Sequence, residues 1–181
     1  MEIQNDKLFR ELQIYFDMGQ NIAIVEPVKL EKKEIIKQFK EKILSEQETV
    51  YIDFSQIDNI CDLAKNILGQ CESIVLTYKL VKINITKVDC TDDYYVLDKA
   101  LNMLQEVSEQ ISKDIVFILK NYTNVLKIKD GKRMQEHMRS VLQHQENILC
   151  VFIGENKELL NEIFMNPSAP FFRFVKMIDI D

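Results

Sequence analysis

The chain has 181 residues, of which 46% are hydrophobic and 29% are charged, and its formal net charge is -6. This length and hydrophobic content predict one domain with its own core, extending over residues 1–181. The acidic charge excludes a general attraction to nucleic acid or to an anionic membrane, and no apolar run reaches the roughly 18 residues that span a bilayer. We therefore expect a cytoplasmic protein that makes no membrane contact.

Five short apolar runs, rich in β-branched and aromatic residues, predict strands at residues 21–25, 49–54, 114–119, 148–154 and 171–178. The middle three runs lack strict alternation of polar and apolar residues, which is typical of strands covered on both faces of a parallel sheet. Residues 32–44 and 94–111 carry apolar side chains at helical spacing and predict amphipathic helices. Strands that alternate with helices predict an α/β fold, a three-layer α/β/α sandwich with a mostly parallel five-stranded sheet.

The region between residues 58 and 91 has a mixed pattern. The run NICDLAKNILGQC, residues 59–71, is typical of a helix, whereas SIVLTYKLVKINITKV, residues 73–88, could be a helix end, an extra strand or a hairpin. The acidic run DCTDDYY, residues 89–95, lacks the spacing and the glycine of a calcium loop. It predicts an N-cap for the helix that follows.

The chain has four cysteines, Cys61, Cys71, Cys90 and Cys150. They are scattered singly, with no CxxC pair and no nearby histidine at ligand spacing, so the pattern predicts no zinc site and no other metal site. Each cysteine lies beside apolar residues. We therefore interpret all four as buried small hydrophobes rather than as ligands or nucleophiles.

The loop after the first predicted strand has the position of a phosphate-binding P-loop but not its residues. A P-loop reads GxxxxGK[ST]: its glycines let backbone N–H groups surround the phosphates, its lysine reaches the β and γ oxygens, and its hydroxyl holds magnesium. Only the lysine is retained here, because glutamates replace both glycines and a second lysine replaces the hydroxyl residue. The eight corresponding positions are Glu26, Pro27, Val28, Lys29, Leu30, Glu31, Lys32 and Lys33.

Six segments along the chain read EPVKLEKK, VYIDFSQI, IVFILKNYTNV, HMRSVLQHQENI, CVFIGENKELLNEIF and SAPFFRF. In their order and spacing, from about residue 8 to residue 176, they resemble the P-loop ATPases of the AAA+ and STAND type. The group often called archaeal ATPases, which also occurs in bacteria, is the most similar. This resemblance implies a sheet in which the strand at 21–25 lies between those at 148–154 and 171–178, with helices on both faces.

The departures from this family lie where ATP would react. After the third strand, the family has a DE pair, an aspartate that binds magnesium and a glutamate that activates water. Lys120 and Asn121 occupy these positions and can do neither, since an ammonium repels magnesium and an amide is not basic. The remaining candidates near the pocket are Glu155 and Asn156 after the fourth strand, and the arginines Arg139 and Arg173, which match the family pattern.

These departures predict an ATPase-derived domain with a decayed nucleotide site, acting as a non-catalytic binding or scaffolding module. We expect no catalytic residue, no metal and no cofactor, a protein partner rather than nucleic acid, and we leave homo-oligomerisation open. One alternative is a regulatory domain of an AAA+ or STAND-type ATPase that holds ATP and magnesium weakly through Lys32. A second is a nucleic-acid-associated ATPase fragment, although such relatives continue into a helical lid and a winged helix that have no counterpart here.

Two lysines bear on what fills the decayed site. Lys32 could bind an anion at a helix N-terminus, but a cluster of lysines and glutamates at a helix start is ordinarily a solvated cap. Lys120 ends a strand that the loop encloses, and a buried ammonium without a partner is costly. We therefore expect Lys120 to form an ion pair with Glu26 or Glu31, in place of a magnesium-bridged phosphate.

Overall fold

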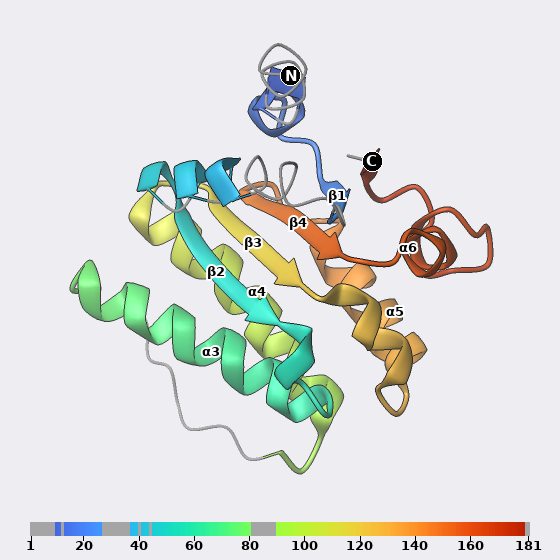
Figure 1. Cartoon of the computed structure of the whole chain (residues 1–181). Helices are drawn as coiled ribbons and strands as arrows, with labels where there is room; N and C mark the ends of the chain where they lie inside the picture. Colours follow the sequence, from blue (N-terminus) through green and yellow to red (C-terminus); the bar gives the residue numbers. More distant parts are fainter. Residues whose placement is uncertain are drawn as a thin grey trace.

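The architecture comes from a computed structural model, which describes residues 10, 11, 13–26, 37–39, 41–43, 45–80 and 90–179. Its centre is a five-stranded sheet in which all neighbouring strands are parallel (Figure 1). The strands are β1 (Ile22–Val25), β2 (Glu48–Asp53), β3 (Ile115–Lys120), β4 (Ile148–Gly154) and β5 (Lys176–Asp179). Their order across the sheet is β2-β3-β4-β1-β5, so the predicted parallel sheet is confirmed.

The strand before the loop, β1, lies between β4 and β5, as the family resemblance implied. On one side Val25 is in register with Gly154, and on the other side it is in register with Asp179. The strand β4 has the predicted bounds, and the ends of β1, β2 and β3 differ from the predicted ones by no more than one residue. Local apolar patterning therefore located four of the five strands.

The fifth strand is shorter than predicted, because pairing with β1 begins only at Lys176. Residues 171–175 form turns, closed by hydrogen bonds from Phe172 N to Ala169 O at 3.1 Å and from Phe174 N to Phe171 O at 3.0 Å. Phe171 is fully buried. The apolar run at 171–175 thus reflects the burial of aromatic rings and not the pairing of the backbone.

The helices are α3 (Ile60–Thr77), α4 (Asp93–Ile111), α5 (Gly131–Leu142) and α6 (Lys157–Phe164), with the 3-10 helices η1 (Phe54–Gln56) and η2 (Tyr122–Lys127). The ambiguous run at 73–88 is therefore a helix end as far as Thr77, and residues 81–88 lie outside the described residues. The predicted N-cap is confirmed, since Asp92 accepts hydrogen bonds at 3.2 Å from the backbone N–H groups of Tyr94 and Tyr95. Within the described ranges, no helix is long and apolar enough to cross a membrane.

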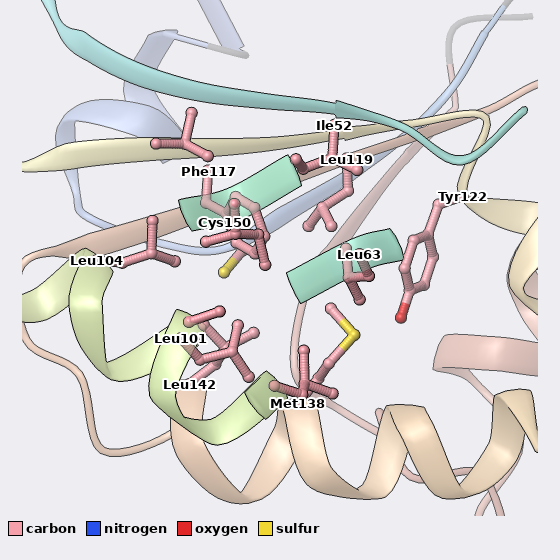
Figure 2. Close-up of a cluster of buried hydrophobic side chains, with 14 of the residues drawn as sticks. Ile52, Leu63, Leu101, Leu104, Phe117, Leu119, Tyr122, Met138, Leu142 and Cys150 are labelled. Carbon is pink, nitrogen blue, oxygen red and sulfur yellow. The ribbon is translucent and has the colours of Figure 1, made fainter. Parts of the chain in front are cut away.

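Alternate residues of the strands supply the two apolar faces of the sheet. On one face, Phe117 of β3 and Phe152 of β4 belong to the larger core, which α3, α4, α5 and α6 complete. Figure 1 shows α3 and α4 against this face, and Figure 2 shows part of this core in detail. On the other face, Ile118 packs in a smaller core with Phe39 and Ile43, two of the residues in the predicted helix at 32–44. Apolar cores thus lie on both faces of the sheet, as the predicted three-layer sandwich requires.

The interpretation of the cysteines is right for two of them and wrong for the other two. Cys71 and Cys150 are free and buried, and burial raises the pKa of the Cys71 thiol to about 12. Cys61 and Cys90, however, form a disulfide across a sequence separation of 29 residues. Cys61 lies in the first turn of α3 and Cys90 shortly before α4, and these two helices pack together. Their proximity arises from helix packing, which their spacing in the sequence does not reveal.

Candidate functional site

The candidate site is the carboxyl edge of the sheet, where the polar residues that follow β1, β3 and β4 come together. The half-buried Glu26 follows β1, and its backbone N–H donates a hydrogen bond of 2.7 Å to the carbonyl of Gly154 at the end of β4. This bond extends the pairing of the two strands by one step. The other predicted loop positions, residues 27–33, lie outside the described residues.

Lys120 and Asn121 lie at the end of β3, where the family resemblance places a magnesium ligand and a base. Lys120 is in register with Asp53, the last residue of β2. Asn121 has a left-handed backbone, with φ 52°, and its side-chain Nδ2 donates a hydrogen bond of 2.8 Å to Asp53 Oδ1. Asp53 Oδ1 also accepts a bond of 2.9 Å from the backbone N–H of Ser55, which caps η1. Asn121 therefore joins the end of β3 to the start of η1.

The Asp53 carboxyl is held as an anion by these neighbours. Burial alone would raise its pKa, but hydrogen bonds from Ser55 and Asn121 and the positive charge of Lys120 outweigh burial and lower the pKa below its ordinary value of 3.8. A lowered pKa stabilises the fold above the ordinary value, and this stabilisation is lost as the pH falls through the lowered one. Sequence reasoning assigned Asp53 no role, although it is the aspartate of the VYIDF segment.

The predicted ion pair between Lys120 and Glu26 is absent from the described part of the chain, and Glu31 lies outside it. The carboxylate whose pKa the Lys120 charge lowers is that of Asp53. The physical reason is the register, since β2 and not β1 is the neighbour of β3. The charge of Lys120 thus acts on a carboxylate of the adjacent strand.

The remaining candidate residues are a helix cap, an exposed carboxylate and two arginines beside aromatic rings. Asn156 caps α6, accepting a hydrogen bond of 2.9 Å from the backbone N–H of Leu159, and Glu155 beside it is exposed. Arg139 lies over the ring of Phe174, with its guanidinium carbon 4.3 Å from the ring centroid, and burial lowers its pKa. The exposed Arg173 lies 5.0 Å from the ring centroid of Phe172. Neither arginine forms an ion pair with Glu26 or Glu155 within the described ranges.

The described residues hold one group of potential metal ligands, and it is not at this edge. It consists of Cys61, Cys90 and Asp93, whose ligand atoms lie within 4.8 Å of one another. The two sulfur atoms form the disulfide and are therefore not thiolates, the form that binds metals. At the carboxyl edge itself, the two residues at the end of β3 are an ammonium, which repels magnesium, and an amide, which is not basic enough to take a proton from water.

The role of Asn121 can be tested by comparing two substitutions. Asn121→Ala removes the bond to Asp53 and places a β-carbon in a left-handed conformation, so we expect a loss of about 1–2 kcal/mol in the free energy of unfolding. Asn121→Gly removes the same bond without that steric cost and should be the milder change, by roughly 0.5–1 kcal/mol. Urea denaturation at pH 7 measures both. If alanine proves milder than glycine, the left-handed assignment is wrong.

Comparison with known proteins extends the description of the fold. No protein-family profile matches the sequence, and no curated protein is similar enough to match it. Among solved structures, the Walker-type ATPase of Pyrococcus abyssi is similar with a TM-score of 0.71 and 12% identity, over 96% of this chain and 52% of that one. Cdc6p from Pyrobaculum aerophilum is similar with a TM-score of 0.59 and 15% identity, over 97% and 44% of the two chains.

A third similar structure is the ORC1 protein of Aeropyrum pernix, determined in complex with DNA, with a TM-score of 0.57 and 11% identity. It is matched over 97% of this chain and 44% of its own length, so this chain spans about half the length of the structures that it matches. At these identities the likeness concerns the fold. The chain has the α/β fold of these structures, with a five-stranded parallel sheet.

Proposed function

We propose that this chain is an ATPase-like domain whose nucleotide site has decayed, and that it acts as a non-catalytic binding or scaffolding module toward a protein partner. The observation that carries the proposal is the pair Lys120 and Asn121 at the end of β3. In an ATPase of this fold, an acid at this edge holds magnesium, and a polar residue activates or orients water. Here the amide of Asn121 is engaged by Asp53, and the charge of Lys120 is positive.

The loop sequence supports the same proposal. Glutamates at positions 26 and 31 replace the glycines that would let backbone N–H groups approach phosphate, and they add negative charge where phosphate would lie. Magnesium and a general base each lower the barrier to hydrolysis by several kcal/mol, so the loss of both removes turnover on any useful timescale.

Phosphate release from ATP tests this proposal. We expect the purified chain with ATP and magnesium to release phosphate at the rate of buffer alone, and we expect the variant Lys32→Ala to behave identically, because neither Lys120 nor Asn121 can activate water. A contaminating ATPase would not respond to a substitution in this chain. Release that exceeds buffer and disappears in Lys32→Ala would therefore overturn the proposal.

Calorimetric titration with ATP and magnesium separates this proposal from the alternative of a regulatory domain that holds ATP weakly. Saturable binding that is lost in Lys32→Ala and kept in Lys29→Ala would favour that alternative, because Lys29 is the matched loop lysine that we expect to be solvated. The absence of saturable binding favours the decayed site. Nucleic acid is not expected to bind, since the net charge of -6 opposes contact with phosphate backbones.

A further inference from the structure

A separate cavity of about 250 Å³ lies between the first turns of α5 and the end of α6. Its apolar wall includes Leu126, Ile128 and Ile163. Its polar lining includes Lys132 and Gln135 of α5 and Glu162 of α6. The volume is below the roughly 300–1,000 Å³ of sites for drug-sized ligands, so the cavity suits a smaller molecule.

The lining contains a buried polar group without a partner. Gln135 is 3% exposed, and its side-chain Oε1 makes no hydrogen bond within the described part of the chain. Buried carbonyl oxygens nearly always accept a hydrogen bond. A buried acceptor without a donor has lost its hydrogen bonds to water without replacing them, which costs free energy. Gln135 lies one helical turn beyond Gly131, which also lines the cavity. A ligand with an N–H donor would satisfy this oxygen.

The lining also carries two opposite charges that do not neutralise each other. Lys132 of α5 and Glu162 of α6 are both exposed, and they form no ion pair with one another among the described residues. Lys132 is in the first turn of α5, where the helix dipole favours an anion, and the N-cap residue Asp130 makes no side-chain hydrogen bond to that turn. The cavity thus offers one place for an anion and another for a cation.

We propose that this cavity binds a free α-amino acid with an apolar side chain. Its carboxylate pairs with Lys132 at the start of α5, and its ammonium donates to Gln135 Oε1 and pairs with Glu162. Its side chain packs against the apolar wall of Leu126, Ile128 and Ile163. A zwitterion with an apolar body has charges, a donor and a surface that match these three parts of the lining.

Calorimetric titration of the full chain with L-leucine and two analogues tests this proposal. 3-Methylbutylamine is leucine without the carboxylate, and 4-methylpentanoate is leucine without the ammonium, so each analogue removes one charge and keeps the apolar body. We expect leucine to bind at least about tenfold more tightly than either analogue, the usual size of one charge-assisted hydrogen bond. Equal affinities would show an apolar cavity that does not recognise the zwitterion, and would overturn the proposal.

Substitutions of the lining residues test whether leucine binds in this cavity. Lys132→Ala, Glu162→Ala and Gln135→Leu should each weaken leucine binding by about tenfold, and Gln135→Leu should keep the fold because it replaces an unsatisfied polar group by an apolar one. The matched controls are Lys129→Ala and Glu158→Ala, which remove exposed charges near the same helices but outside the lining. No saturable leucine binding by the wild-type chain, or equal weakening in the controls, would refute the assignment.

Discussion

Truncating Phe152 to alanine is expected to lower the free energy of unfolding by about 3–5 kcal/mol, the usual cost of removing a buried aromatic ring. Phe152 lies in the middle of β4 and is fully buried. Its ring centroid is 4.7 Å from that of Tyr122, 4.9 Å from that of Phe164 and 5.5 Å from that of Phe171. These rings come from η2, α6 and the turn before β5, so one substitution loosens three elements. Equilibrium denaturation in urea measures the loss.

The control for this prediction is a substitution in the same cluster of rings. Its expected effect on the free energy of unfolding has the opposite sign. Tyr122 is fully buried, and its hydroxyl has no hydrogen-bond partner among the described residues. Burial also raises its pKa, so the phenol stays protonated and still lacks an acceptor. Tyr122→Phe keeps the ring and removes the unsatisfied group, which should raise the free energy of unfolding by about 1–2 kcal/mol. Figure 2 shows Tyr122 in this core.

Together, the two variants separate the contribution of ring packing from that of the Tyr122 hydroxyl. If Tyr122→Phe destabilises the chain by more than about 1 kcal/mol, the hydroxyl has a partner and the cluster is not held by apolar contact alone. If Phe152→Ala costs less than about 2 kcal/mol, the neighbouring rings collapse into the space and the packing is looser than described. Unchanged denaturant slopes in both variants would show that the folded and unfolded states keep their compactness.

Replacing Gly131 by alanine is expected to lower the free energy of unfolding by about 3 kcal/mol, at the upper end of the usual cost of overpacking. Gly131 begins α5, directly beside η2, and a β-carbon there would lie 2.1 Å from the carbonyl oxygen of Val125. That atom belongs to the backbone and cannot rotate away. The clash therefore forces the junction between η2 and α5 apart.

Gly69 is the matched control, because it lies inside α3 and a β-carbon there would meet no atom within 4 Å. Gly69→Ala should raise the free energy of unfolding by about 0.5–1 kcal/mol, since alanine loses less backbone entropy in a helix. Thermal melting of both variants, followed by circular dichroism, gives the comparison. Equal midpoints for the two variants would contradict the close approach of Val125 and Gly131.

Several features of this protein follow from local sequence patterns. The run at 148–154 predicted β4 with its observed bounds, because a strand covered on both faces needs an uninterrupted apolar segment. The run at 94–111 predicted α4 within one residue, and the acidic run at 89–95 predicted an N-cap, which the structure places at Asp92. The residue types at the end of β3, an ammonium and an amide, are likewise read directly from the sequence. Such features depend on neighbours in the chain, so the chain alone specifies them.

Other features depend on which elements become neighbours in space. Asp53 and Asn121 are 68 residues apart, and they meet because β2 pairs with β3 in a defined register. That register also places Lys120 beside Asp53 rather than in an ion pair with Glu26, and helix packing brings Cys61 to Cys90. The cavity beside Gln135 is lined by residues from η2, α5, α6 and the loop that follows α6. The sequence by itself thus determined four of the five strands, the helices α3 and α4 and the residue types at each strand end, because these depend on local patterning. The tertiary structure decided which side chains meet, because the order of the strands and the packing of the helices join residues that are distant in the chain.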